Sequence, residues 1–380
     1  MKANQSVIRR GYFLSIISFI ILIGYLLALS GYYFSPAQWA AGGVFNPGFV
    51  YAWVVMSGCM IAWFFRNKIW AFFFLVLLAA GVPPLSVSFS VGTATGFQRE
   101  KSDATIRIMQ WNCEDIGGNL SWYTEKNIGR KRAADFIREY NPDVICMQDY
   151  SDFRGNIYKS NESFFRDTLG YPHNVFALHV SQVKPYGVIK SGLKIVSKYP
   201  IEAHGVYYYK NISVPEAILW ADIMVNQTRL RVVTTHFRSY YLSGNRIFSD
   251  QLPNYMHQDS SIVMENNVIE KLVYFQKQHT QQAAQLRAFL DTCSVPVILC
   301  ADLNTVPSSH LYQLVRGNME DGYMGNETGL GATYNYLLPN IRIDYIFHHP
   351  LISLFQWKHF KDGFFDHDHL LGDYSIPKPN

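Results

Sequence analysis

A long stretch without formal charge near the amino terminus most constrains what this chain can fold into. No Asp, Glu, Lys or Arg lies between Arg10 and Arg66. A helix that crosses the hydrocarbon core of a bilayer needs about 20 apolar residues. Residues 11–34 and 47–65 are each long enough, and turn signals at residues 35–36 and 46–47 separate them. The sequence therefore predicts an α-helical membrane region.

A third apolar run covers residues 69–89, although Pro83-Pro84 interrupts it near its end. Lys and Arg residues flanking the runs decide the orientation, because cations favour the cytoplasmic side. These cations are Lys2, Arg9 and Arg10 before the first run, and Arg66 and Lys68 before the third. We expect about three spans in the cytoplasmic (inner) membrane of a bacterium, with the rest of the chain outside. If the third run does not cross, the rest would face the cytoplasm.

The remaining chain reads as a linker followed by one α/β domain. Residues 92–104 are rich in Ser, Gly and Thr, which favours a linker. We therefore predict a membrane region at 1–91, a linker at 92–104 and a catalytic domain at 105–380. The five cysteines form no CxxC pair, and Cys146 and Cys300 lie in apolar patterns typical of buried free thiols.

Strand-like segments outnumber helical ones after residue 105, which favours two packed sheets with outer helices over a doubly wound sheet. We expect strands at 105–111, 144–148, 174–180, 187–197, 217–225, 230–235, 297–301, 342–347 and 351–357. Helices are expected at 130–140, 264–291 and 309–315.

Polar residues recur where these strands end. Asp302 and Asn304 follow the apolar segment 297–301, and residues two apart on an extended chain share a face. The other strand ends carry Asn112 and Glu114, Asp149, His236 and Asp344, and the chain closes with Asp366-His367-Asp368-His369. Side chains of these types at so many strand ends predict one shared rim with a site.

The ordered motifs WNxE, PDVICMQD, GLKIVSKYPI, TTH, ADLN, RIDYIF and DH resemble the endonuclease/exonuclease/phosphatase superfamily across residues 105–376. This resemblance implies a four-layered α/β sandwich, with two central mixed sheets flanked by helices. It also implies hydrolysis of a phosphoester by in-line attack of water, without a covalent enzyme intermediate.

The resemblance implies a divalent metal, Mg²⁺ or alternatively Mn²⁺. Its ligands would be Asp149, Asn112, Glu114 and Asp368. Mg²⁺ prefers hard oxygen ligands and needs only one or two carboxylates. Asp149 stands where the family has Glu, so its shorter arm would shift the metal or recruit Glu114 more strongly.

The resemblance also assigns catalytic roles. His236 would contact the phosphate, Asp302 would orient the attacking water, and Asn304 would bind the phosphoryl group. His369 would act at phosphorus, hydrogen-bonded to Asp344. Asp366 and His367 are expected to be loop residues, with His367 in place of the family's Ser.

Three functions follow as hypotheses. The first is a membrane-anchored, metal-dependent phosphodiesterase or phosphatase. The second is a membrane-tethered nuclease, which the modest net charge of +4 does not favour. The third is a degenerate binding module, for which the evidence is Asp149, Ala301 and His367. The substrate would be a lipid head group, a small phosphoester or a nucleic acid. Membrane lipid would surround the amino-terminal helices, and no protein partner is predicted.

Overall fold

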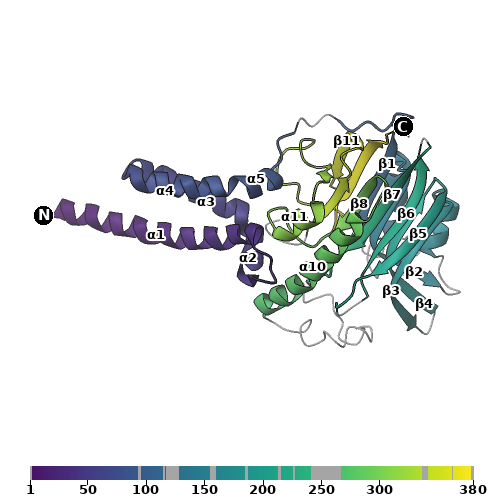
Figure 1. The fold of residues 1–380 in the computed structure, drawn as a ribbon, viewed down its shortest axis with the longest axis horizontal. Helices are drawn as coiled ribbons and strands as arrows, with labels where there is room; N and C mark the ends of the chain where they lie inside the picture. Colours follow the sequence, from purple (N-terminus) through teal and green to yellow (C-terminus); the bar gives the residue numbers. More distant parts are fainter. Residues whose placement is uncertain are drawn as a thin grey trace.

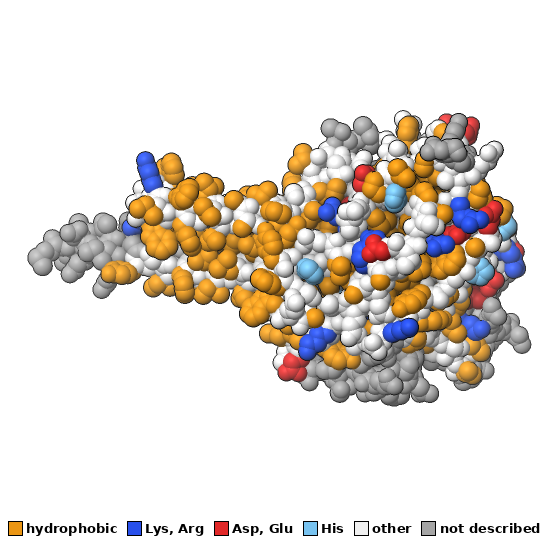
Figure 2. Space-filling model, viewed as in Figure 1, with side chains coloured by type: hydrophobic (Ala, Val, Ile, Leu, Met, Phe, Trp, Pro, Cys, Tyr) orange, Lys and Arg blue, Asp and Glu red, His pale blue; other side chains and the backbone are white. Residues whose placement is uncertain are grey.

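The chain is described by a computed structural model that covers residues 2–92, 96–113, 116, 128–154, 160–184, 187–212, 215–225, 227–240, 267–335, 341–361 and 363–377. Its helical amino-terminal part projects as a rod from a globular part (Figure 1). Apolar side chains cover this rod, whereas charged side chains gather on the globular part (Figure 2).

The amino-terminal part of the chain consists of helices. They are α1 (Lys2–Tyr33), α2 (Ala40–Phe45), η1 (Asn46–Gly48), α3 (Phe49–Phe64), α4 (Lys68–Ala80) and α5 (Val82–Ser88). Residues 12–33 and 40–64 are each long and apolar enough to cross a membrane. The pair α4 and α5, bent by 50°, is either a broken third span or a re-entrant loop. The amino terminus and the turn between α3 and α4 both lie far from the globular part (Figure 1).

The globular part is built on two six-stranded sheets. The first has the order β11-β12-β1-β2-β4-β3 and the second β5-β6-β7-β8-β10-β9. The strands are β1 (Ile106–Asn112), β2 (Val144–Arg154), β3 (His173–Lys184), β4 (Gly187–Ser197), β5 (Ile201–Tyr208), β6 (Ala217–Val225), β7 (Thr228–His236), β8 (Val297–Asp302), β9 (Glu320–Asp321), β10 (Asp344–His348), β11 (Ser353–Phe360) and β12 (His369–Ser375). Of these pairs, only β1–β2 and β7–β8 are parallel.

Alternating side chains divide each central strand between two cores. In β8, Ile298 and Cys300 pack between the sheets, whereas Leu299 and Ala301 pack under the outer helices. Those helices are α10 (Val268–Asp291) and α11 (His310–Arg316). In β1, Ile108 faces the inter-sheet core and Met109 the layer of α7 (Ile128–Tyr140). The predicted four-layered sandwich is confirmed. The short helices α8 (Asn161–Ser163) and η2 (Phe164–Thr168) follow β2.

The strand predictions missed β5, β9 and β12. In β12, Gly372 and Asp373 interrupt the apolar pattern, yet both are buried because the strand lies between β1 and β11. Asp373 is buried against Arg107 of β1, whose Nε and Nη2 donate to its two carboxylate oxygens at 2.7 and 2.8 Å. Both side chains are fully excluded from solvent. A buried polar strand of this kind has no apolar signature in the sequence.

We predict that Asp373→Ala destabilises the protein by about 3–5 kcal/mol, because it leaves the Arg107 guanidinium buried without its charge partner. Pulse proteolysis in urea on the detergent-solubilised chain would measure the free energy of unfolding. The matched control is Glu202→Ala, which breaks the exposed Arg229–Glu202 pair and should cost less than about 1 kcal/mol. Equal losses of unfolding free energy in the two variants would show that the buried Arg107–Asp373 pair contributes no more than an exposed pair.

Candidate active site

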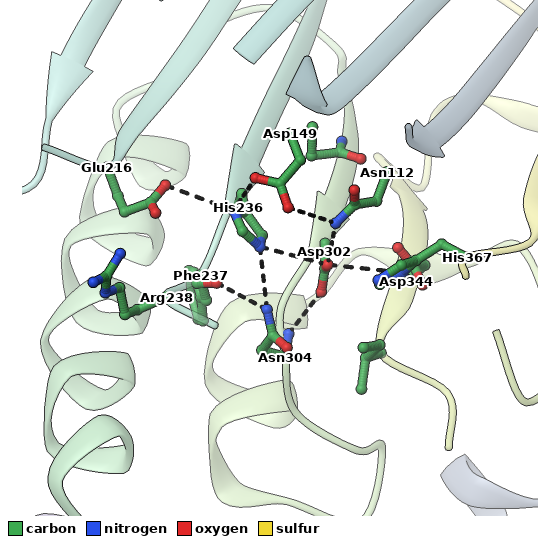
Figure 3. Close-up of polar contacts among 12 residues, drawn as sticks. Asn112, Asp149, Glu216, His236, Phe237, Arg238, Asp302, Asn304, Asp344 and His367 are labelled. Carbon is green, nitrogen blue, oxygen red and sulfur yellow. Dashed lines mark hydrogen bonds and ion pairs between the residues drawn. The ribbon is translucent and has the colours of Figure 1, made fainter. Parts of the chain in front are cut away.

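Three neighbouring strands of the second sheet place polar residues opposite one another. The register of β7 with β8 sets His236 opposite Asp302, and that of β8 with β10 sets Asp344 opposite Asp302. Asn112, at the end of β1, reaches the same place from the first sheet and donates to Asp302 Oδ2 at 2.9 Å. Figure 3 shows these side chains turned toward one another.

Asp302 is the most enclosed carboxylate of the site. It is fully buried, and its Oδ1 accepts the backbone N–H of Asn304 at 3.0 Å. Burial and then the negative charge of Asp344 raise the pKa of Asp302 to about 6, although His367, His236 and Asn112 act in the opposite direction. A carboxylate with a pKa near neutrality is suited to exchange protons with water.

Asp344 forms an ion pair with His367. Nδ1 of His367 lies 2.9 Å from Oδ2 of Asp344 and 3.8 Å from Oδ2 of Asp302. Burial alone would lower the pKa of His367, but the two carboxylates outweigh it and hold the pKa well above the usual value. These carboxylates therefore favour the charged form of the imidazole, and its ring packs on Tyr334 with centroids 4.9 Å apart.

His236 lies between a second pair of acids. Its Nδ1 is 3.5 Å from Asp149 Oδ1 and 3.7 Å from Glu216 Oε2, while its Nε2 is 3.2 Å from Asn304 Nδ2. Burial acts to lower the pKa of His236, but the charges of Asp149, Glu216 and then Asp302 raise it overall. The site thus holds two histidines whose charged forms are favoured by neighbouring carboxylates (Figure 3).

The backbone conformation at two of these residues sets the direction of their side chains. Asp149 and Asn304 have φ values of +47° and +46°, a region that Asp and Asn tolerate better than most residues. Asp149 sits where the register of β2 shifts against β4, between Met147 and Tyr150. Non-glycine residues in this conformation often occur at functional sites. The bulge turns Asp149 toward Asn112 and His236, and the Asp149 side chain remains about 51% exposed.

Two groups of side chains are candidates for a divalent metal. Asp302, Asp344 and His367 offer ligand atoms within 4.8 Å of one another. Nδ1 of His367 is already engaged by Asp344 at 2.9 Å, so this trio fits an ion-paired acid cluster better than a ligand set. Asp149 fits a hard cation better, because among the described residues its half-exposed carboxylate makes only long contacts, 3.5 Å to both Asn112 Nδ2 and His236 Nδ1.

Two sequence predictions need correction. His369 does not bond to Asp344: it is the first residue of β12, fully buried, and stacked on Trp111 with centroids 5.0 Å apart. Neither of its ring nitrogens has a hydrogen-bond partner among the residues that the structure describes. Asp368 is not in the three-residue cluster; it bonds to His359 Nε2 at 2.7 Å and Asn335 Nδ2 at 2.8 Å. Glu114 lies outside the described residues.

The error has a simple origin in the sequence. The dipeptide Asp-His occurs twice, as Asp366-His367 and Asp368-His369, and the motif alone does not say which histidine reaches the site. Because β12 begins at His369, only the earlier histidine stands before the strand and can reach the rim. Glu216 was also missed. It is buried beside His179 and His236, and although burial raises its pKa, these histidines lower it to about 2. Its position just before β6 gave no motif.

A two-sheet sandwich with buried carboxylates and histidines at its strand ends is the architecture of phosphoester-hydrolysing enzymes of the DNase I type. The sequence profile described as the Endonuclease/Exonuclease/phosphatase family matches residues 109–363. The chain belongs to this family. Residues 11–88 match a second profile, described as a domain of unknown function. No curated protein sequence matches the chain.

Solved structures share the fold at low identity. An endonuclease/exonuclease/phosphatase from Beutenbergia cavernae is 20% identical, with a TM-score of 0.50, covering 72% of each chain. The catalytic domain of human Nocturnin with bound sulfate is 15% identical, with a TM-score of 0.48, covering 72% of this chain and 94% of its own. A family protein from Leptotrichia buccalis is also 15% identical, with a TM-score of 0.48, covering 71% and 100%.

We predict that His369→Phe retains phosphoester hydrolysis within about threefold, because Phe fills the same stack and no hydrogen bond is lost. His367→Phe, the matched control, should lose at least about 100-fold. Assays with bis-p-nitrophenyl phosphate would measure both. Loss of activity in His369→Phe but not in His367→Phe would return the catalytic role to His369.

The same variant should alter the acid sensitivity of folding. Burial lowers the pKa of His369 to about 3, whereas an unfolded histidine titrates near 6.5. Below pH 6.5, His369 is therefore protonated in the unfolded chain but not in the native chain. As a consequence, the free energy of unfolding of the wild type falls as the pH falls toward 3. In this window, the free energy of unfolding of His369→Phe should fall by up to about 1 kcal/mol less per pH unit than that of the wild type, as measured by pulse proteolysis.

Proposed function

We propose that this protein is a membrane-anchored, divalent-metal-dependent phosphoester hydrolase. The observation that carries the proposal is the convergence of Asp302 with the Asp344–His367 pair and with His236. A buried carboxylate between two imidazoles whose charged forms the neighbouring carboxylates favour would provide a base for water and positive charge for a phosphoryl group. The intact set also favours an enzyme over a degenerate binding module.

Asp302 orients the attacking water and accepts its proton. Two bonds hold this carboxylate, from Asn112 Nδ2 at 2.9 Å and from the Asn304 N–H at 3.0 Å, so its orientation is fixed before substrate arrives. A preoriented base lowers the entropic cost of bringing water in line with the phosphorus.

His236, Asn304 and His367 surround the place that a phosphoryl group would occupy. Donors directed at the non-bridging oxygens stabilise the charge that develops in the transition state. Asn304 Nδ2 is held by the Phe237 carbonyl at 2.9 Å, and His367 by Asp344 at 2.9 Å, so both face the site without further reorganisation.

Asp149 would hold the metal, with Asn112 beside it. A bound divalent cation would neutralise charge on the phosphoryl oxygens. Asp149 is one methylene shorter than a glutamate, and the β2 bulge at this residue offsets the shorter reach by turning the carboxylate into the site.

The membrane location and its orientation are part of the proposal. The apolar helices α1 and α3 support the location. The cations Arg66 and Lys68 lie at the turn between α3 and α4, at the same end of the rod as the amino terminus (Figure 1). Cations favour the cytoplasm, so the globular domain at the opposite end lies outside.

Metal removal tests the function. The full-length chain in detergent should hydrolyse bis-p-nitrophenyl phosphate or p-nitrophenyl phosphate with Mg²⁺ or Mn²⁺, lose at least about 100-fold on chelation with EDTA, and recover on adding metal back. Asp149→Ala should raise the metal concentration needed for half-maximal rate. Turnover that persists undiminished in EDTA would contradict the metal assignment.

We predict that Asp302→Asn lowers turnover by about 10³-fold or more, since an amide keeps the shape but cannot accept the proton. Stability should be unchanged or higher, because one of two carboxylates buried together becomes neutral. Activity and pulse proteolysis would be measured on the same preparation, with Asp291→Asn on exposed α10 as the control. Activity within threefold of wild type would refute the role of Asp302.

A further inference from the structure

The membrane helices dock onto the catalytic rim through buried, specific contacts. Asn46, at the start of η1, donates to the Ser308 carbonyl at 2.8 Å and accepts from Ser308 Oγ at 2.9 Å. Gln313 of α11 donates to the Tyr32 carbonyl at 2.8 Å. A Cβ added to Gly43 would collide with Gln276 of α10 at 2.1 Å, so α2 lies directly on this helix. The membrane region is therefore seated on the catalytic domain in one fixed position.

A cavity of about 70 Å³ lies at this junction and reaches the candidate active site. Asn304 lines it from the catalytic side, and Gly31 and Pro36 line it from the end of α1. Leu272 and Ile341 contribute apolar walls. All of the described residues around it are uncharged. A polyanion such as nucleic acid needs many cations along its path, and the described walls offer none, so they suit an amphiphile that carries a single phosphate and is otherwise apolar.

Aromatic side chains indicate where the bilayer surface lies. Tyr33, Phe34 and Trp39 follow one another at the end of the apolar part of α1 and are each 44–53% exposed. Tyr and Trp gather at the level of lipid head groups. Gly31 and Pro36 bracket this level, so the cavity beside Asn304 opens at the height of the head groups.

A second, separate hollow lies beside the same helix and extends from this level into its apolar part. A groove of about 530 Å³ is lined by Ile23, Leu26, Leu27 and Ser30 of α1 and by Phe34, Gln38 and Trp39 beyond it. From Ser30 to Ile23 it extends about 10 Å into the span, at 1.5 Å per residue. A groove at this depth is surrounded by hydrocarbon, so its occupant is a lipid chain.

We propose that the substrate is an amphiphilic phosphoester of the membrane, whose phosphate enters the site past Asn304 while its hydrocarbon tail stays in the α1 groove. This inference rests on the proposed function and names its substrate class. In the reaction, the oxygen of water joins phosphorus, the bond from phosphorus to the leaving oxygen breaks, and the leaving alcohol receives a proton.

Two esters that differ only in their tail test the proposal. Hexadecyl p-nitrophenyl phosphate and methyl p-nitrophenyl phosphate share the phosphodiester and the leaving group, and both release p-nitrophenol. The full-length chain is placed in nanodiscs of digalactosyldiacylglycerol, a bilayer that contains no competing phosphate, with Mg²⁺. Nanodiscs expose both faces, so orientation does not limit access.

Leu26→Trp fills the groove far from the catalytic residues, and Ile20→Trp, on an exposed position of the same helix outside the groove, is its control. Leu272→Trp narrows the cavity, and Ile269→Trp, exposed on the same helix α10, is its control. We expect Leu26→Trp and Leu272→Trp to lower kcat/KM for the hexadecyl ester at least about tenfold and to leave the methyl ester within twofold. The bilayer is the same throughout, so partitioning cancels. Leu26→Trp changes a lipid-exposed residue and keeps the test decisive if Leu272→Trp does not fold.

The outcomes separate the inference from the function beneath it. Equal effects of the filling variants on both esters, or no effect on either, would overturn the inference while the methyl ester still reports a working hydrolase. Hydrolysis of neither ester would overturn the inference, and failure to hydrolyse p-nitrophenyl phosphate as well would overturn the proposed function. Faster cleavage of a single-stranded oligonucleotide, unaffected by both filling variants, would assign the site to nucleic acid and overturn the inference.

Discussion

A buried chain of amide hydrogen bonds between the two sheets is the interaction on which the site depends. Gln110 Nε2 donates to Gln148 Oε1 at 3.0 Å within the first sheet and to Asp344 Oδ1 at 2.9 Å in the second. Gln148 Nε2 donates across to Thr234 Oγ1 at 2.8 Å. Apolar packing between sheets is non-directional and tolerates sliding, whereas a buried hydrogen bond lost on sliding costs about 1–3 kcal/mol. These bonds therefore set the position of Asn112 relative to Asp302 and Asp344.

Burying the charged groups of the site costs free energy of folding, and the pairing of opposite charges offsets part of this cost. Asp302 and Asp344 are both fully enclosed, and such proximity disfavours two negative charges. His367 and His236 flank the carboxylates and reduce the cost; His236 ends β7, and His367 lies two residues before β12. The same arrangement suits the proposed chemistry, because a carboxylate with a raised pKa is a better proton acceptor and the carboxylates favour the charged imidazoles. The protein is therefore less stable at the site because it holds buried charge there. The left-handed backbone conformation of Asp149 and Asn304 adds a second local cost of the same kind.

Residues were predictable where short-range pattern and function coincide. The apolar run before Asp302 and Asn304, and the run before His236, each identified a strand and its end, and the structure brings these three residues together. The histidine pairing was not predictable, because two Asp-His steps lie two residues apart and only the long-range pairing of β12 with β1 decides which of them enters the sheet. Gln110 and Gln148 have the alternation of ordinary strand residues, so their bridge between sheets is visible only in three dimensions. The buried Arg107–Asp373 pair is hidden for the same reason, since it joins residues that are 266 positions apart.

The membrane region and the catalytic domain constrain each other at one small contact. Asn46 is almost fully buried, and it bonds both to the Ala28 carbonyl of α1, at 3.0 Å, and to Ser308, only four residues after Asn304. A span in a bilayer has its depth fixed by its apolar length, within the cost of mismatch. Because Asn46 ties the end of that span to the loop after β8, the depth of α1 also sets the height of the catalytic rim. A freely tethered domain would need a long linker, but Arg342 binds the Val87 carbonyl at 2.9 Å, and Ser90 pairs with Gly329. The chain at the end of α5 is thus fastened to the globular domain at two points. With the helices in a bilayer as proposed, these contacts would keep the site at the bilayer surface.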